Sequence, residues 1–297
     1  MHPAPSLLFF TTLSGLGFGL LAWLGIDPSP PSRAGGPALL VLAFALCLAG
    51  LGASALHLGR RERALKAFSQ WRTSWLSREA WAALATLLLG GGYGLSLLLG
   101  RPVLPLGWLT ALCALGTVAC TGMIYAQLRS VPRWHHGSTP VLFLAYALSG
   151  GALLAGQEIA AVVLLALTAL LQIWVWRDGD TRFARSGSSL ASATGLGDRG
   201  TPRALFPPHA GGSYLLREMV FVVARRHARK LRVLALLLAT LLPGALLLAG
   251  LASALPGPVP QLFTFISLGA HVAGVLVSRW LFFAEAEHVV GLYYGSR

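Results

Sequence analysis

The run LPLGWLTALCALGTVACTGMIYA, from Leu104 to Ala126, contains no charged residue. At a rise of about 1.5 Å per residue, a helix of about 20 residues matches a bilayer hydrocarbon core of about 30 Å. Backbone groups in lipid have to bond within their own segment, so a helix is the expected form. The run therefore predicts a transmembrane helix.

Seven further runs have the same character. The eight predicted spans are Leu7–Leu24, Pro37–His57, Glu79–Leu99, Leu104–Ala126, Pro140–Ala155, Glu158–Trp176, Leu231–Ala252 and Leu262–Ala284. The 297 residues are 55% hydrophobic and 11% charged, against about 25% charged in a typical soluble domain. We expect an all-α, polytopic integral membrane protein with eight transmembrane helices and one membrane-anchor domain over residues 1–297.

The net charge of +13 does not indicate nucleic-acid binding, because the basic residues gather in a few loops between apolar spans. Most of the 23 lysines and arginines follow spans two, four and six, and the opposite loops hold only Arg33 and Arg101. The positive-inside tendency then predicts a multi-pass protein of the bacterial inner membrane with both termini in the cytoplasm. A partner protein docked on the basic face would also explain the charge.

The loop after span six has two parts. Residues Gly187–Gly212 are rich in glycine, serine and proline, which predicts a flexible linker. Residues Tyr214–Arg232 mix apolar and basic side chains at helical spacing, which indicates a basic amphipathic helix at the membrane surface that leads into span seven. A stop signal with snorkelling arginines is the alternative.

The cysteines do not form a metal motif. Cys47, Cys113 and Cys120 each fall inside an apolar run and no C-x-x-C occurs, so we interpret them as small apolar residues. We expect no metal site, haem or iron–sulfur cluster in this chain.

The stretch WRTSWLSRE, Trp71 to Glu79, places polar residues directly before span three. A structural interpretation makes the tryptophans interface anchors, Ser77 the helix cap and Glu79 a first-turn acid that suits the helix dipole. A functional interpretation notes that His57 closes span two and Glu79 opens span three, on the same membrane face. Quinol oxidation releases two protons with two electrons and needs proton acceptors at such a place.

Further polar residues are expected on this face. Arg72 and Arg78 lie in the loop before span three, and Arg279 and Glu285 lie at the end of span eight. Arg279 is too deep for free solvation unless it pairs or snorkels, and Glu285 or Glu79 is a candidate partner. Structural pairing and quinone binding are both open for Arg279.

The chain resembles the membrane anchor subunit of the dimethyl sulfoxide reductase family. The likeness is carried by MHPAPSLLFFTTLSGLGFGLL (Met1–Leu21), WRTSWLSREAW (Trp71–Trp81), MIYAQLRSVPRW (Met123–Trp134) and SRWLFFAEAEHVVGLYYG (Ser278–Gly295). The order and spacing of the four pieces make the match specific. The linker Gly187–Gly212 does not take part.

The resemblance implies a subunit without its own redox centre that anchors a molybdopterin catalytic subunit and a four-cluster iron–sulfur subunit. Such a subunit binds menaquinol as its substrate and passes the electrons to the iron–sulfur partner. In the family, a histidine that ends the second helix and a glutamate that begins the third are implicated in menaquinol binding, and His57 and Glu79 match these positions. The roles of Arg72, Arg78, Arg279 and Glu285 are inferred from their depth and face alone.

Three points stay open. The catalytic subunits of this family are commonly exported, whereas the charge pattern places the polar, motif-bearing face in the cytoplasm. A haem-bearing quinol oxidase subunit needs facing histidine pairs, and only His271 lies near the middle of a span. A secondary transporter usually has internal repeats and polar residues in broken helices, and no convincing repeat is present.

Overall fold

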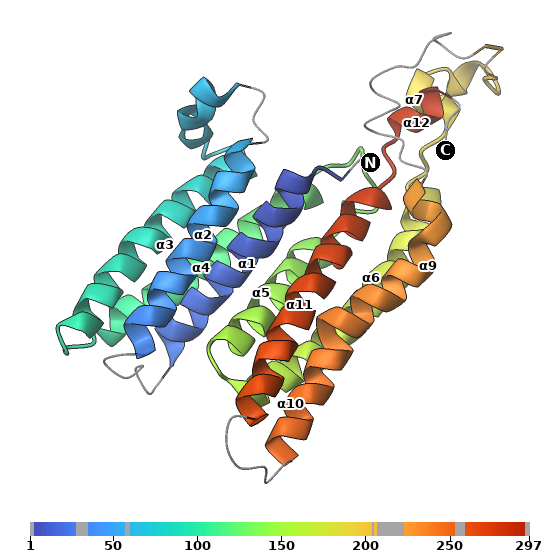
Figure 1. Ribbon diagram of the computed structural model, residues 1–297. Coiled ribbons are helices and arrows are strands. Elements are labelled where there is room, and N and C mark those ends of the chain that lie inside the picture. Colours follow the sequence, from blue (N-terminus) through green and yellow to red (C-terminus); the bar gives the residue numbers. More distant parts are fainter. Residues whose placement is uncertain are drawn as a thin grey trace.

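The computed structural model describes residues 3–27, 35–56, 60–203, 205–206, 223–252 and 259–294. Over these ranges the chain is helical, and its long helices lie side by side in a bundle (Figure 1). The principal helices are α1 (Pro5–Ile26), α2 (Gly35–Leu56), α3 (Trp75–Leu98), α4 (Leu104–Ala126), α5 (Ser138–Leu154), α6 (Glu158–Arg185), α9 (Val223–Leu236), α10 (Leu242–Ala252) and α11 (Val259–Ala284). The predicted all-α class is confirmed.

Each of the eight predicted spans corresponds to a helix. Within the described ranges, seven helices are long and apolar enough to cross a membrane, and the seventh predicted span is built from α9, α10 and the turn between them. The remaining one, α5, has 17 residues and a length of about 25 Å. It packs between α1 and α6, in line with the other spans (Figure 1).

The start of α3 and the end of α6 differ from the prediction. Helix α3 begins at Trp75 and is capped by Ser74, whose hydroxyl accepts from the backbone N–H of Ser77 at 3.4 Å. The prediction that Ser77 caps this helix was wrong, and Glu79 lies beyond the first turn. Helix α6 continues past Trp176 to Arg185, because an i,i+4 ion pair between Asp178 and Arg182 stabilises its polar end.

Helix α1 is the centre of the bundle and contacts α2, α4, α5 and α11. Its close approach to α5 depends on glycine. A Cβ at Gly19 would lie 1.9 Å from the carbonyl oxygen of Ala147, and a Cβ at Gly151 would lie 2.3 Å from the carbonyl carbon of Gly19. Small residues let transmembrane helices pack backbone to backbone, which compensates for the weak hydrophobic drive between helices in lipid.

A π-helical turn, η3 (Leu237–Leu241), joins α9 to α10. Pro243 follows it and has no N–H, so the carbonyl of Ala239 lacks the usual helix donor four residues on. The Nδ1 atom of His271 in α11 lies 2.6 Å from this carbonyl oxygen. Helix α11 can come this close because residue 274 is a glycine, whose Cβ would meet the backbone nitrogen of Ala239 at 2.1 Å.

The loop after α6 is partly folded where the structure describes it. Helix α7 (Leu190–Thr194) begins with a reciprocal capping box between Ser189 and Ser192, and a short 3₁₀ turn, η2 (Gly197–Arg199), follows. Helix α7 contacts the C-terminal helix α12 (Val290–Tyr293). The end of the predicted linker and the start of the predicted amphipathic helix fall outside the described residues, and α9 begins at Val223.

Candidate functional site

Glu79 is a carboxylic acid buried inside the bundle, with 3% of its surface exposed. It lies near the start of α3 and faces α4, where the hydroxyl of Thr121 contacts one of its carboxyl oxygens. The same hydroxyl lies 3.1 Å from the carbonyl oxygen of Thr117. Because a threonine hydroxyl has one proton, it can donate to only one of these two oxygens at a time. When it donates to Thr117, a protonated Glu79 can donate to Thr121.

The segment before α3 is folded back onto that helix. Its 3₁₀ helix, η1 (Arg61–Phe68), is tied to α3 by the indole N–H of Trp81, which donates to the carbonyl oxygen of Phe68 at 3.0 Å. The hydroxyl of Ser77 accepts from the backbone N–H of Gln70 at 3.2 Å. Ser77 therefore fixes the loop rather than the helix end. His57, which the sequence placed beside Glu79, lies outside the described residues.

Arg72 and Arg78 belong to this loop structure. The guanidinium of Arg78 donates to the carbonyl oxygens of Trp71 and Arg72 at 3.0 and 2.7 Å and lies 4.3 Å from the ring centroid of Trp75. Arg72 is exposed, with its guanidinium 5.4 Å from the ring centroid of Trp71. These contacts give both arginines a structural use at the membrane border, and their assignment to quinol binding stays a prediction.

Tyr125 on α4 lies near Arg279, because both pack on Phe143: the ring centroids of Tyr125 and Phe143 are 5.7 Å apart, and the Arg279 guanidinium carbon lies 3.5 Å from the Phe143 centroid. The Tyr125 ring is packed edge-on against Trp134, Phe282 and Phe283, with centroids 5.3 to 5.5 Å apart. Trp134 in turn donates to the carbonyl oxygen of Phe282 at 2.9 Å. This aromatic cluster joins α4 to α11 and excludes lipid from the space around the Tyr125 phenol.

Arg279 is 2% exposed and forms no ion pair with any residue in the described ranges. Its guanidinium carbon lies 3.5 Å from the ring centroid of Phe143 and 5.5 Å from that of Tyr146, so two aromatic faces stabilise the cation. Its Nε atom has no hydrogen-bond partner within those ranges. A cavity of about 30 Å³ adjoins it and is also lined by Gln172 and Ser278.

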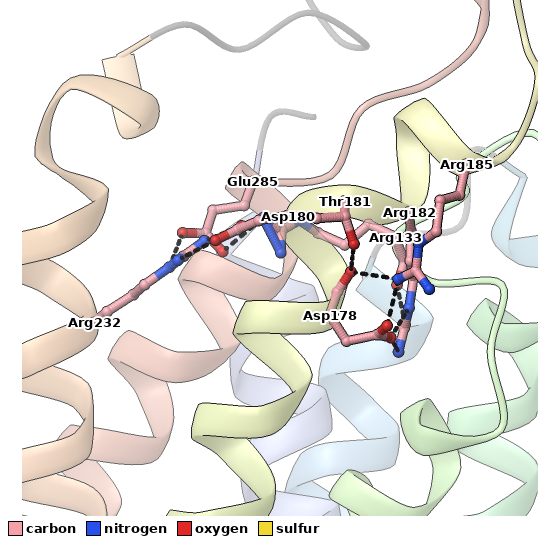
Figure 2. A network of polar contacts seen from close by, with 8 residues as sticks. All are labelled: Arg133, Asp178, Asp180, Thr181, Arg182, Arg185, Arg232 and Glu285. Atoms are coloured by element: carbon pink, nitrogen blue, oxygen red, sulfur yellow. Dashed lines mark hydrogen bonds and ion pairs between the residues drawn. The ribbon is translucent and has the colours of Figure 1, made fainter.

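Glu285 does not pair with Arg279, which corrects one of the two partners suggested from the sequence. It accepts from Arg232 at 2.7 Å and lies 3.6 Å from Arg133. Both arginines also contact Asp180, at 2.6 and 2.5 Å, which closes a four-residue ion network between α6, α9, the residue that follows α11 and the loop after α4 (Figure 2). This network links α6, α9 and the end of α11 to one another at the polar end of the bundle.

A second ion cluster lies beside this network, on the same end of α6 (Figure 2). Asp178 pairs with Arg182 and Arg185, and Arg182 also donates to the carbonyl oxygen of Arg133 at 2.9 Å and to the hydroxyl of Ser138 at 3.0 Å. A pocket of about 520 Å³ opens here, and burial together with Arg182 lowers the pKa of His136 on its wall. The neutral form of His136 is therefore favoured beside the three arginines that line the pocket.

An apolar groove of about 490 Å³ runs between α2 and α3, in the half of the membrane away from Glu79. Its lining includes Leu40, Phe44 and Gly94 and contains no charged side chain. Over the described ranges, no group of three or more histidine, cysteine, aspartate or glutamate residues is placed to hold a metal ion.

The structure thus divides the six residues proposed from the sequence. Glu79 and Arg279 lie in the interior, Glu285 belongs to the ion network, Arg78 holds the loop, Arg72 is exposed in that loop, and His57 lies outside the described residues. Sequence reasoning missed Thr121 and Asp180. The i,i+4 pair Thr117 and Thr121 in an apolar run was a usable signal for the first, whereas Asp180 became significant only when α6 proved longer than its apolar run.

Comparison with known proteins bears on the whole chain. Residues 1–177 match the family model described as DMSO reductase anchor subunit (DmsC). The chain is 32% identical to the C subunit of sulfite dehydrogenase from Allochromatium vinosum, over 100% of this chain and 99% of that protein. It is 34% identical to anaerobic dimethyl sulfoxide reductase chain YnfH of Escherichia coli, over 40% of this chain and 43% of that protein. With its apolar helices and its match over more than half of its length, the chain belongs to the family of DMSO reductase membrane anchor subunits.

Proposed function

We propose that the chain anchors a molybdopterin oxidoreductase complex in the bacterial inner membrane and exchanges electrons with the quinone pool. In the first form of the proposal it oxidises menaquinol beside Glu79 and passes the electrons to a four-cluster iron–sulfur subunit. The observation that carries the proposal is the carboxyl group of Glu79, which is almost fully buried at the end of a membrane helix and contacts a hydroxyl that can exchange a proton with it.

The chemistry requires such a group. Menaquinol oxidation releases two electrons and two protons, and a positioned acceptor within hydrogen-bond reach takes a proton as the electrons leave. Glu79 accepts one proton, and Thr121 then turns its own proton toward Thr117 so that the protonated acid keeps a partner. By the family resemblance, His57 is the candidate acceptor for the second proton. Ionisable groups at this depth are costly in lipid, which favours a functional use.

We place the partner subunits at the membrane end that carries η1 and the ion network of Figure 2. This end exposes apolar side chains among basic ones, including Leu65 and Trp71, in the segment between the apolar runs of α2 and α3. A polar rim around exposed apolar residues is typical of a protein interface. Electrons that leave quinol beside Glu79 would then reach the iron–sulfur partner on the nearer side.

The opposite direction is the second candidate, and one finding favours it. The relative that matches over its full length is described as part of a sulfite dehydrogenase. A dehydrogenase withdraws electrons from its substrate, so its anchor would reduce quinone, with two electrons and two protons added to the ring. Glu79 would then donate a proton instead of accepting one.

The test compares Glu79→Gln with Glu62→Gln, which alters an exposed acid of η1 outside the bundle. Each variant is expressed with its partner subunits and purified as the complex. We expect Glu79→Gln to retain the partner subunits and the activity with a soluble redox dye that bypasses quinone. We expect its turnover with a short-chain naphthoquinol to fall by about 10²-fold or more, as for the loss of a general acid–base group.

The direction of electron transfer is measured with the same preparations. Turnover is compared when they are given the reduced naphthoquinol with an artificial acceptor and when they are given the oxidised quinone with sulfite. Normal naphthoquinol turnover in an assembled Glu79→Gln complex would refute the assigned site. Loss of the partner subunits from Glu62→Gln would instead identify η1 as part of the docking surface.

A further inference from the structure

The buried side of α11 carries polar side chains along most of its length. They are, in order, Thr264, Ser267, His271, Ser278 and Arg279, with Glu285 just beyond the end of the helix. At 1.5 Å per residue the series from Thr264 to Glu285 rises by about 30 Å, which is the thickness of the hydrocarbon core. Ser267 and His271 are completely buried. A polar line of this length is expensive in a membrane helix and calls for a function.

The line begins at the membrane face opposite the ion network. There the hydroxyl of Thr264 donates to a carboxyl oxygen of Glu158 at 3.2 Å. Glu158 is the first residue of α6, which ends at the ion-network face. One turn further into the membrane, the hydroxyl of Ser267 donates to the carbonyl oxygen of Pro243 at 3.2 Å. The far end of the line is therefore a half-buried acid, with the buried hydroxyl of Ser267 one turn deeper.

His271 lies in the middle and has one ring nitrogen available. Its Nδ1 atom donates to the carbonyl oxygen of Ala239, which Pro243 leaves without a helix donor. In the neutral ring this contact assigns the proton to Nδ1, so Nε2 is an acceptor. Nε2 lies near the backbone of Tyr146, in a contact without good hydrogen-bond geometry, and has no other partner in the described part of the chain. A fully buried ring nitrogen without a well-formed hydrogen bond is rare in proteins, and a bound water or a transferred proton would complete it.

Tyr146 continues the line from His271 toward Arg279. The two ring centroids of Tyr146 and His271 are 6.3 Å apart. The Tyr146 hydroxyl donates to Oε1 of Gln172 at 2.9 Å, and the same oxygen accepts from Ser278 at 3.0 Å. The cavity of about 30 Å³ beside Gln172 and Arg279 has room for one water, since about 10–15 Å³ is enough.

We propose that this line is a proton path, assisted by bound water, that connects the membrane face at Glu158 with the buried region around Arg279, Tyr125 and Glu79. The inference rests on the proposed function, because the quinone reaction is the source or the sink of the protons. In the structure, Ser267 and His271 donate to backbone carbonyls. Tyr146 and Ser278 both donate to Gln172. Bound water therefore has to carry the proton between successive groups, each of which accepts one proton as it gives up another. Arg279 lies at the inner end of the path, beside the cavity that has room for one water.

A consequence can be measured. If electrons leave for the partner on the ion-network face while protons leave at the Glu158 face, each turnover separates charge across the membrane. The complex would then generate a membrane potential. If protons left beside the partner subunits instead, no charge would be separated.

The experiment uses the complex with its partner subunits, reconstituted into sealed vesicles and driven with a naphthoquinol and an impermeant acceptor. A potential-sensitive dye reports charge separation, and addition of an uncoupler gives the dye signal at zero membrane potential. The variants are Tyr146→Phe, which keeps the ring and removes only the hydroxyl, and His271→Leu. The matched control is Thr110→Val, because Thr110 is equally buried but its hydroxyl donates to the backbone of its own helix, Leu106, at 2.8 Å.

We expect the wild type and Thr110→Val to build a potential, and Tyr146→Phe and His271→Leu to lower its rate of formation at least about tenfold. Activity with the dye that bypasses quinone should be unchanged in every assembled complex. Two results would overturn the path: turnover of the wild type without any potential, or a full potential in Tyr146→Phe. Neither result would touch the assignment of Glu79, which its own variant tests.

Discussion

Glu79 and Thr121 show how one contact at the residue scale combines stability with chemistry. The carboxyl group is removed from water, and the hydroxyl of Thr121 is the partner that the structure gives it. A buried polar group that loses its partner costs about 1–3 kcal/mol. The contact therefore has to be kept for folding and has to remain able to exchange a proton for function.

This gives a first prediction for Thr121→Val, which preserves shape and removes the hydroxyl. We expect the unfolding free energy in detergent to fall by about 1–3 kcal/mol, and the turnover with naphthoquinol to slow. Thr110→Val on the same helix is the control, because its hydroxyl donates within α4. Equal effects of the two substitutions on turnover would show that Thr121 has no special relation to Glu79.

Residue type alone could not assign the arginines. Arg78, Arg182 and Arg279 lie in comparable sequence surroundings near helix ends, yet the first binds loop carbonyls, the second bridges Asp178 and Ser138, and the third stacks on Phe143. A long side chain can reach any of several partners, so its role depends on which helix stands beside it. The sequence identified these residues as unusual but not what they contact.

At the scale of elements, glycine determines which helices can touch. Gly19 on α1 meets the backbone of Ala147 on α5, whereas Gly15 on the same helix has no atom near its missing Cβ. In the sequence the two glycines are equivalent, because both lie within the same apolar run. Only the first is needed for packing, because α5 crosses α1 at that level.

The pair of glycines provides a second prediction with its own control. We expect Gly19→Ala to force α1 and α5 apart, lower the thermal midpoint in detergent by several degrees and reduce the yield of monodisperse protein. Gly15→Ala should cause no loss, since alanine is the better helix former by roughly 0.5–1 kcal/mol. Size-exclusion chromatography and thermal unfolding of the two variants make the comparison. A stable Gly19→Ala protein would contradict the helix arrangement.

The ends of α6 and α3 show why boundaries were harder to predict than spans. Hydrophobicity marks where a helix enters lipid but not where it stops in water. Helix α6 continues through Asp178 and Arg182 because those residues pair one turn apart. Helix α3 begins before its apolar run because Ser74 supplies the cap. Both effects depend on a few polar contacts that a count of apolar residues does not contain.

At the scale of the whole molecule, the basic loops and the ion network lie on one end of the bundle. Helices α1 and α2 form an antiparallel pair, so η1 lies on the same end as the start of α1, and the loop at Arg101 lies on the other (Figure 1). The excess of positive charge at the first end predicts that it is cytoplasmic. The orientation decides on which side of the membrane the partner subunits work.

The third prediction tests this orientation by cysteine labelling. The three native cysteines are replaced by alanine, and single cysteines are introduced as Ala64→Cys in η1 and Arg101→Cys in the loop after α3. With an impermeant reagent on intact cells, we expect Arg101→Cys to be labelled and Ala64→Cys to remain unlabelled until the cells are opened. The reverse pattern would place the charged end in the periplasm and show that partner docking, not the positive-inside tendency, explains the charge.

The sequence by itself determined the membrane class, the positions of the eight apolar helices and the family, because hydrophobicity over about 20 residues is a local property that the bilayer reads directly. It also identified Glu79 and Arg279 as unusual. Only the tertiary structure decided that Thr121 partners Glu79, that Glu285 belongs to Arg232 and Arg133, and that Tyr146 of α5 and Ser278 of α11 both donate to Gln172 of α6. These contacts are made between segments far apart in the chain, and close helix packing at glycines, rather than any local pattern, brings them together.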